Sequence, residues 1–423
     1  MKSFALNNGT RVHLLPFQGT EACSLLVLFG VGSREESDSV WGGSHFIEHL
    51  MFKGTKRRPK TVDISRELDR FGAQYNAYTG KDLTGYWVKI DGQHAARAVD
   101  LLHDMLFHSK FDATEMTREK KVIVEEIKMY EENPIMHIED LLEEALFDGF
   151  VLGKNIAGTA ESVLGMKRAD VLSYRDRFYV PENMVVVMAG RVPKEARTLL
   201  KSTFGTIASS SQPVERHGQT CSFEHLPPGC RVRVQKKSLD QVQLALGFPT
   251  LGRGHKAEEA TKLLANILGG TMSSRLFVEV RERRGLCYSV RAGYDAYKDV
   301  GVFQIRAGLD GKRLSQAWKV ILAELKKVAK NGVTSQELAM AKDHVRGALA
   351  LSLEDSSDRA EFYGRQELYL GKVESPEQRL AHYDRVTRAQ VKDAAGRILN
   401  LHRCAVAAIG PFDEKEFRKQ IQL

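Results

Sequence analysis

The sequence predicts an α+β protein made of two homologous αβ sandwich domains, each a mostly antiparallel sheet with helices packed on one face. Three observations support this fold class. Strand-like and helix-like segments occur in separate groups, similar segments recur about 220 residues apart, and the composition is that of a globular protein. With 423 residues, of which 43% are hydrophobic and 27% charged, the chain is long enough for two domains with large cores.

The first half contains the full set of expected elements. Apolar or alternating runs predict strands, and runs with a helical period predict helices. We expect strands at residues 10–15, 23–31, 86–90 and 184–190, and helices at residues 41–52, 94–106 and 113–132. The last helix should end before Pro134, because proline cannot continue a helix.

The second half repeats this arrangement. Residues 168–171 and the apolar run 184–190 resemble residues 388–391 and 404–410 at an offset of 220, and residues 26–28 resemble residues 244–246 at an offset of 218. Repeats of this length indicate duplicated domains and not a solenoid. We therefore predict an N-terminal domain over residues 1–210, a linker over 211–228 and a C-terminal domain over 229–423. The linker begins in a small, polar, proline-containing stretch.

A His-x-x-Glu-His motif predicts a metal site in the first half. Residues three and four apart share a face of a helix, so His45 and His49 can chelate one ion while Glu48 stands beside it. Zinc binds imidazole well, and a catalytic zinc site needs a third protein ligand and a fourth position for water. Glu48 would deprotonate that water. This order of residues is the inverzincin pattern. The alternative is that the three side chains only decorate a solvated helix face.

Acids on the helix at residues 113–132 are candidates for the third ligand. Glu119 and Glu126 are two helical turns apart and therefore share a face. Glu125 is the rival, but it points about 100° away from Glu126, so the two cannot face one ion equally.

These residues together resemble the pitrilysin, insulin-degrading enzyme and mitochondrial processing peptidase family. The resemblance covers the short motif, the 76 residues that separate it from Glu126, and Glu119 seven residues earlier. It implies that His45, His49 and Glu126 hold one Zn²⁺ per chain. It also implies that Glu48 is the general base, and that Glu119 supports the site as a partner of a ligand histidine.

Two further segments match the family. Arg281 and Tyr288, seven residues apart, resemble a pair that contacts substrate near the zinc, although an arginine cluster is more often a solvated face. Asn76, Ala77 and Tyr78 resemble a strand edge that pairs with the substrate backbone. Without the resemblance, the second segment would be interpreted as an ordinary edge strand.

The resemblance implies a zinc metalloendopeptidase that hydrolyses peptides or unfolded polypeptides. The repeat places Leu263, Asn266 and Ile267 at the positions of the motif and Ala348 at that of Glu126, so the second domain should lack metal. The family builds a chamber from four such domains, and this chain has two. We therefore expect a homodimer, or a heterodimer with a family relative, in which Arg281 and Tyr288 of one subunit reach toward the zinc of the other.

Two alternatives remain open for the function. The first is a non-catalytic or assembly subunit of a processing-peptidase-like complex, although such relatives usually lack some ligands. The second is a ribosylhomocysteine lyase, a class that shares the motif. Those enzymes are much shorter and lack the duplication.

Charge and cysteine content limit the partners. The net charge of +8 is spread thinly and no nucleic-acid module is recognisable, so we expect no nucleic-acid partner. No signal peptide or membrane span is evident, and five cysteines without Cys-x-x-Cys spacing indicate a reducing compartment, the cytoplasm or an organelle matrix. Seven acidic residues lie between positions 131 and 148. If they line the active site, their negative charge would favour basic peptides. The alternative is that they are ordinary surface charge on a helix.

Overall fold

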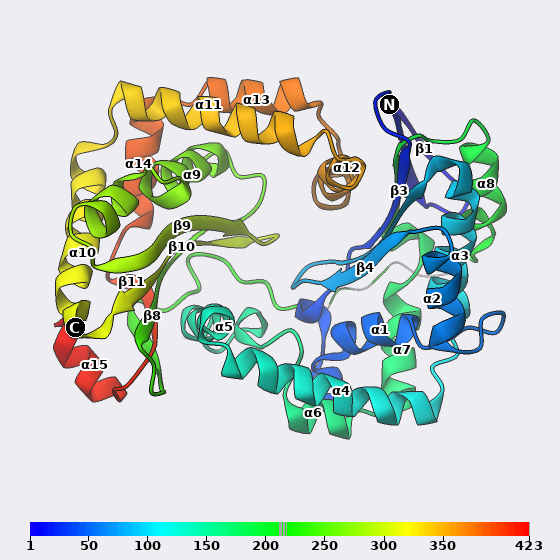
Figure 1. The fold of residues 1–423 in the computed structure, drawn as a ribbon, viewed down its shortest axis with the longest axis horizontal. Coiled ribbons are helices and arrows are strands. Elements are labelled where there is room, and N and C mark those ends of the chain that lie inside the picture. The colour runs from blue at the N-terminus through cyan, green and yellow to red at the C-terminus, as the bar shows by residue number, and fades with distance from the viewer. Residues whose placement is uncertain (211–213, 215, 217, 423) are drawn as a thin grey trace. The chain divides into compact units, whose positions relative to one another are not determined.

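Two β-sheets organise the chain, each in its own unit (Figure 1). The computed structural model describes residues 1–210, 214, 216 and 218–422. Unit 1 consists of Met1–Ile127, Asn155–Gln219 and Leu349–Glu374, and unit 2 of Lys128–Lys154, Thr220–Ala348 and Ser375–Leu423. The predicted boundaries at residues 210 and 229 follow sequence order and stay a prediction. Part of the predicted linker, residues 211–213, 215 and 217, lies outside the described residues.

The sheet of unit 1 has six strands in the order β1-β2-β6-β3-β5-β4. Neighbouring strands are antiparallel except β2 and β6, which are parallel. The strands are β1 (Lys2–Ala5), β2 (Arg11–Pro16), β3 (Ala22–Phe29), β4 (Gln74–Thr79), β5 (Thr84–Asp91) and β6 (Met184–Gly190). The predicted strands correspond to β2, β3, β5 and β6, which are rich in apolar and β-branched residues.

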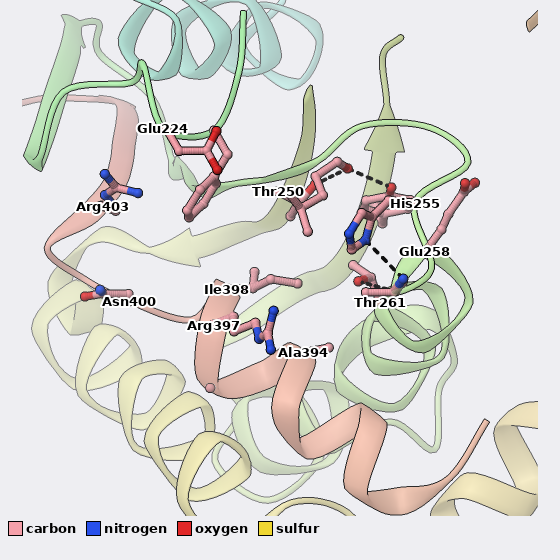
Figure 2. Close-up of a pocket in the computed structure, with 15 residues that line it drawn as sticks. Glu224, Thr250, His255, Glu258, Thr261, Ala394, Arg397, Ile398, Asn400 and Arg403 are labelled. Atoms are coloured by element: carbon pink, nitrogen blue, oxygen red, sulfur yellow. Dashed lines mark hydrogen bonds between the residues drawn. The ribbon is translucent and has the colours of Figure 1, made fainter. Parts of the chain in front are cut away.

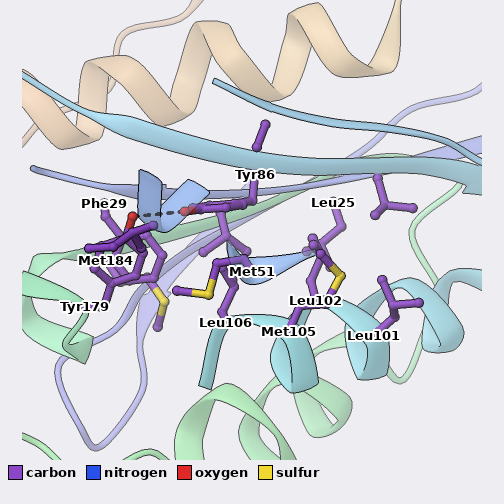
Figure 3. Close-up of a cluster of buried hydrophobic side chains, with 14 of the residues drawn as sticks. Leu25, Phe29, Met51, Tyr86, Leu101, Leu102, Met105, Leu106, Tyr179 and Met184 are labelled. Atoms are coloured by element: carbon purple, nitrogen blue, oxygen red, sulfur yellow. Dashed lines mark hydrogen bonds between the residues drawn. The ribbon is translucent and has the colours of Figure 1, made fainter. Parts of the chain in front are cut away.

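Helices pack on one face of this sheet to form the main core of unit 1. Figure 3 shows leucine and methionine side chains of α3 directed toward the strands. The buried hydroxyls of Tyr86 and Tyr179 bond to each other at 2.9 Å, which satisfies both in the apolar core. The helices are α1 (Gly43–Met51), α2 (Thr61–Asp69), α3 (Ala95–His108), α4 (Ala113–Glu132), α6 (Ala160–Gly165), α7 (Arg168–Phe178) and α8 (Ala196–Ser202). The bounds of α4 are those predicted, and residues 128–132 of this helix belong to unit 2.

Unit 2 repeats the arrangement with five strands in the order β7-β11-β8-β10-β9, and only β7 and β11 run parallel. The strands are β7 (Gly229–Lys236), β8 (Gln241–Leu251), β9 (Cys287–Ala296), β10 (Val300–Asp310) and β11 (Arg403–Gly410). The helices are α9 (Glu258–Ala265), α10 (Leu314–Asn331), α11 (Ser335–Ser352), α13 (Pro376–Asp384), α14 (Arg388–Ile398) and α15 (Glu414–Ile421), with α11 continuing to its end in unit 1. The predicted α+β fold with two similar domains is confirmed.

One helix covers the second face of each sheet, so helices lie on both faces and not on one. In unit 1 this helix is α12 (Ser356–Leu370), which packs on β3 and β6 although it comes from the second half of the sequence. In unit 2 it is α5 (Pro134–Leu146), which comes from the first half and packs on β8 and β11. Each sheet is therefore buried on both faces, which explains why β6 is buried along its whole length.

The two units correspond at an offset of 219 residues in the central strands, not at the predicted 218. Leu25, Val27 and Phe29 face the helix-side core of unit 1, and Leu244, Leu246 and Phe248 face that of unit 2. An offset of 218 would match residues from opposite faces, because successive side chains of a strand alternate. In the last strands the offset of 220 holds: Val186 and Val406 both face the helix-side core.

None of the helices in the described part of the chain combines the length and apolar character needed to cross a bilayer.

Candidate metal centre

Helices α1 and α4 bring two imidazoles and one carboxylate together in unit 1. The Nε2 atoms of His45 and His49 are 3.2 Å apart, and the Glu126 carboxylate oxygens lie 3.7 Å from the first and 3.4 Å from the second. Within the residues that the structure describes, this is the one group of three or more His, Cys, Asp or Glu side chains so arranged. The predicted ligand set therefore converges.

The donor geometry fits a zinc ion. Ligand atoms placed about 2.0–2.2 Å from a tetrahedral zinc are separated from one another by roughly 3.3–3.6 Å. The three separations just given lie close to that range, and two imidazole nitrogens with one carboxylate oxygen are donors that zinc accepts. Three protein ligands leave a fourth position for water or substrate, which is the composition of a catalytic site.

Glu119 and Lys53 hold His49 from the other side. The Nδ1 atom of His49 lies 2.8 Å from one oxygen of Glu119, and the Lys53 ammonium lies 2.7 Å from the other. A proton on Nδ1 leaves the lone pair of Nε2 directed at the cluster, so Glu119 selects the tautomer that can bind a metal. Glu119 therefore contacts both His49 and Lys53.

The pKa values of the two histidines in the cluster are shifted in opposite directions. Burial lowers the pKa of His45 to about 4, so this imidazole is neutral and can donate its lone pair. Burial also opposes the charge of His49, but hydrogen bonds to Glu119 and Glu126 outweigh it and raise the pKa to about 9. The hydrogen bond to His49 lowers the pKa of Glu126 and keeps it ionised. A metal cation would take over the charge that the His49 proton now supplies.

Glu48 lies on the same helix, and a hydroxyl from β4 binds it. Thr79 donates a 2.6 Å hydrogen bond to one Glu48 oxygen, which fixes the carboxylate and leaves the other oxygen available. Burial raises the pKa of Glu48, while the Thr79 bond acts in the opposite direction. A raised carboxylate pKa suits a group that must both accept and return a proton near neutral pH.

Glu125, the rival third ligand, is exposed on α4 and lies outside the metal-ligand cluster. The helical angle between adjacent residues explains this difference, because Glu126 faces α1 and Glu125 turns away.

A buried carboxylate supports the start of α1. Glu36 accepts 2.7 Å hydrogen bonds from the backbone N–H groups of Gly42 and Ser44. These amides have no partners within the helix, and a carboxylate at a helix N-terminus also complements its dipole. The Tyr174 hydroxyl then bonds the Ser44 side chain and the Gly32 carbonyl, which ties α1 to α7.

The predicted substrate strand lies at a sheet edge, since β4 is the last strand of the unit 1 sheet. Asn76 is exposed, Ala77 is buried, and the Asn76 side chain accepts a 2.9 Å hydrogen bond from the Ala77 amide. Tyr78 points to the opposite face from Thr79, where its hydroxyl donates to Glu361 and Arg365 stacks on its ring. The Tyr78 side chain is therefore committed to α12, and the edge backbone is what β4 can offer a peptide.

Arg281 and Tyr288 lie together in unit 2. The Arg281 guanidinium is 5.3 Å from the centre of the Tyr288 ring, and Tyr288 is 72% exposed. Arg283 and Arg284 both pair with Glu279, as expected of a solvated cluster, but Arg281 stacks on rings. This difference separates Arg281 from its basic neighbours.

The acids expected near the active site belong to unit 2, and several have partners there. Glu139 pairs with Arg306, Asp148 pairs with Arg233, and Glu143 accepts a hydrogen bond from the Tyr297 hydroxyl. This pairing neutralises part of the negative charge, so the alternative of helix surface charge fits better than a site for basic peptides.

Three supporting residues were not predicted from the sequence: Thr79, Lys53 and Glu36. Lys53 lies four residues after His49, so helical spacing could have indicated it. Thr79 and Glu36 carry no such signal, because their contacts depend on how β4 and the segment before α1 pack in three dimensions.

Comparisons with known proteins identify the family of this chain. The family model described as "Insulinase (Peptidase family M16)" matches residues 12–160, and the model described as "Peptidase M16 inactive domain" matches residues 165–345. An "uncharacterized zinc protease" of Bacillus subtilis, YmxG, is 35% identical over 97% of this chain and 98% of its own length. A protein with the same description from Mycobacterium tuberculosis is 36% identical over 97% of this chain and 93% of its own length.

Solved structures share the fold. A protease from Helicobacter pylori superposes with a TM-score of 0.90 at 23% identity, covering 97% of this chain and 99% of that one. A Pseudomonas fluorescens protein described as a peptidase M16 inactive domain superposes with a TM-score of 0.87 at 20% identity, covering 97% and 98%. At these identities the likeness concerns the fold alone.

Proposed function

This chain belongs to peptidase family M16, and from that premise we propose that it is a zinc-dependent endopeptidase holding one zinc ion through His45, His49 and Glu126. The membership confirms the resemblance seen in the sequence. The observation that carries the proposal is the convergence of the three ligand side chains, with Glu48 held beside them by Thr79. The alternative of a decorated, solvated helix face does not account for that arrangement.

The residues around the cluster suit peptide hydrolysis. When bound, zinc would acidify a water molecule and polarise the scissile carbonyl. Glu48 would accept the proton of the attacking water and later donate it to the leaving amine. Glu119 would keep the His49 tautomer fixed throughout, because its hydrogen bond holds Nδ1 protonated. Thr79 would hold Glu48 in one rotamer, so that the proton transfer needs no reorientation.

Substrate would be held mainly through its backbone. We propose that an extended peptide pairs with the edge of β4 at Asn76 and Ala77, which would give little dependence on side-chain identity. Arg281 and Tyr288 would bind the peptide near the scissile bond, supplied by the second subunit of a dimer. A site that binds backbone in extended form favours peptides and unfolded segments over folded proteins.

The test is digestion of a mixed peptide library by the purified protein, with and without EDTA, followed by mass spectrometry. We expect cleavage that EDTA abolishes and that added zinc restores. Glu48→Gln should retain zinc and lose most turnover, whereas Glu125→Gln, a matched change of an exposed acid on α4, should behave as wild type. Unchanged cleavage by Glu48→Gln would remove Glu48 from its proposed role.

The second candidate, a non-catalytic assembly subunit, predicts that no peptide is cleaved under any of these conditions. The complete ligand set and the positioned base argue against it, since a subunit without catalysis has no use for a fixed Glu48.

A further inference from the structure

Unit 2 contains a cavity of about 460 Å³, and none of the residues that line it has a role in the function proposed above (Figure 2). It lies between α9, α14 and the end of β8, and its walls include Phe223, Leu251, Tyr294 and Ile398. Its volume falls within the range of roughly 300–1,000 Å³ that is usual for small-molecule sites, and its mixture of apolar walls and a few polar groups is also typical of them.

The internal duplication explains why the cavity exists. Helices α7 and α14 correspond at an offset of 220, so Tyr174 corresponds to Ala394 and Phe178 to Ile398. In unit 1 the Tyr174 ring fills the space between α7 and α1, lies 4.9 Å from the Phe178 ring, and is only 7% exposed. In unit 2 Ala394 lines the cavity, so a methyl group stands where unit 1 has a phenol ring.

One hydrogen bond that Tyr174 makes in unit 1 also has a counterpart in unit 2. Tyr174 donates to the Gly32 carbonyl at 3.0 Å, and the carbonyl that corresponds at an offset of 219, that of Leu251, accepts a 3.3 Å bond from Tyr294. Tyr294 comes from β9 and not from α14, so it satisfies that carbonyl from another direction without occupying the space of the ring. The cavity thus retains aromatic surroundings but not the aromatic side chain.

One cation in the wall is available to a ligand. Arg403 stacks on the Phe223 ring at 4.8 Å, and within the described part of the chain no carboxylate pairs with its guanidinium. Two other charged groups of the wall have partners, since Glu258 pairs with Lys262 and the exposed Arg397 pairs with Asp393, whereas the wall carboxylate of Glu224 is exposed. Figure 2 shows Arg403 at the upper left of the view near Glu224, and Arg397 lower in the view beside Ala394.

From these observations we infer that the cavity binds a small aromatic carboxylate, whose ring occupies the space that Tyr174 fills in unit 1 and whose carboxylate pairs with Arg403. Aromatic walls favour an aromatic ring through edge contacts, and a guanidinium favours a carboxylate. The ligand could be a free aromatic acid or the C-terminal aromatic residue of a peptide, which present the same chemistry. Every residue of this site lies in unit 2, so it does not depend on the proposed peptidase reaction.

The test is isothermal titration calorimetry of the full-length protein with 3-(4-hydroxyphenyl)propionate. Ala394→Tyr restores the unit 1 residue and should weaken binding by at least about tenfold, because the new ring takes the ligand's place. Arg403→Gln should weaken it similarly, and Arg418→Gln, an arginine of α15 outside the cavity, should have no effect. Ala394→Leu, which fills less space, serves if Ala394→Tyr does not fold.

Chemical variants of the probe test the ligand class. Cyclohexylpropionate, which lacks the aromatic ring and its hydroxyl, and tyramine, which carries an ammonium group in place of the carboxylate, should both bind more weakly than the parent acid. N-acetyltyrosine represents a peptide C-terminus, and its affinity relative to the free acid decides between the two sources. Absence of saturable binding, or equal binding by the wild type and Ala394→Tyr, would overturn the inference, as would tyramine binding as tightly as the acid.

Discussion

At the residue scale, one hydrogen bond determines where the proposed general base points. The 2.6 Å bond from Thr79 engages one oxygen of Glu48, so we expect the other oxygen to accept the proton of a water molecule in the cluster. No sequence pattern indicates this bond, because the two residues are 31 positions apart and meet only when β4 packs beside α1. The metal motif itself was predictable, since helical spacing alone places His45, Glu48 and His49 on neighbouring faces.

We predict that Thr79→Val keeps zinc but lowers kcat by about 10- to 100-fold, the usual effect of removing a supporting hydrogen bond in such sites. The change is nearly isosteric, so KM for a peptide substrate should move little. Thr79→Ser restores the hydroxyl and should recover most of the rate. Steady-state kinetics with zinc analysis would decide; an equal loss in the Ser and Val variants would contradict the prediction, because the hydroxyl that Ser keeps would then not be enough to sustain the rate.

The choice between two adjacent acids is the second residue-scale prediction. Glu126→Gln should reduce zinc affinity by at least about 100-fold, because one of three protein ligands becomes a neutral amide. Glu125→Gln provides the matched control, since it makes the same chemical change on the same helix at an exposed position. Zinc retained after dialysis, measured by atomic emission, should be near one ion per chain for the control and near zero for Glu126→Gln. The reverse result would exchange the roles of the two residues.

At the element scale, the sequence predicted where the strands and helices lie. It did not always predict which residues of the two units correspond. Strands β3, β5, β6 and β11 were evident from apolar residues, and α4 ends where Pro134 required. The offset between the central strands was misjudged by one residue because both faces of β3 and β8 are apolar, so alternation gave no signal. Pairing with neighbouring strands determines which residues of β3 and β8 lie on each face of the sheet, which the sequence alone left ambiguous.

Equivalent helices of the two units allow a matched stability test. Glu337, near the start of α11, pairs with Arg275 at 2.6 Å and forms a reciprocal cap with Thr334. Glu115 corresponds to it in α4 at an offset of 222 residues, but it forms its salt bridge with Arg118, whose side chain is 69% exposed. We predict that Glu337→Gln lowers the free energy of unfolding at pH 7 by about 1–3 kcal/mol. Glu115→Gln should cost about 0.5 kcal/mol or less.

The pH dependence of the same pair follows from its pKa. Burial opposes ionisation of Glu337, but the Arg275 and Thr334 hydrogen bonds outweigh it and lower the pKa from 4.5 to about 2. A carboxyl whose pKa is lower in the folded state stabilises the protein above pH 4.5, and this contribution is lost as the pH falls toward 2. Urea unfolding at pH 7 and pH 3 should show the difference between Glu337→Gln and wild type shrinking in acid. A difference that is constant with pH would attribute the effect to capping alone.

At the scale of the whole molecule, the exchange of helices α5 and α12 is what sequence analysis could not foresee. Periodicity identifies an amphipathic helix but does not say which sheet it covers. In the structure, each of these helices packs closely on its sheet at a glycine. A Cβ on Gly364 of α12 would approach Leu28 of β3 to 2.9 Å, and a Cβ on Gly247 of β8 would approach Leu142 of α5 to 3.0 Å. Small residues at these positions let each exchanged helix lie tightly on its sheet. Each unit is therefore completed by a segment from the other half of the sequence.

The proposed dimer leads to a prediction about mixed subunits. Glu48→Gln disables the proposed base in unit 1, and Arg281→Ala removes a proposed substrate contact in unit 2, so each variant alone should be nearly inactive. If Arg281 acts on the partner's zinc site, a mixed dimer contains one site with both residues intact. Random exchange of equal amounts should then recover about a quarter of wild-type activity, because half of the dimers are mixed and each has one working site.

If Arg281 acts within its own chain, both chains of a mixed dimer carry a defect at their own site, and no activity returns. Glu48→Gln mixed with His45→Ala is the control, because both changes disable the same metal site and no combination of subunits repairs it. Size-exclusion chromatography must accompany the assay, since recovery requires that subunits exchange. A monomer that cleaves peptides at full rate would refute the shared site directly, because a single chain could then supply every group that the reaction needs.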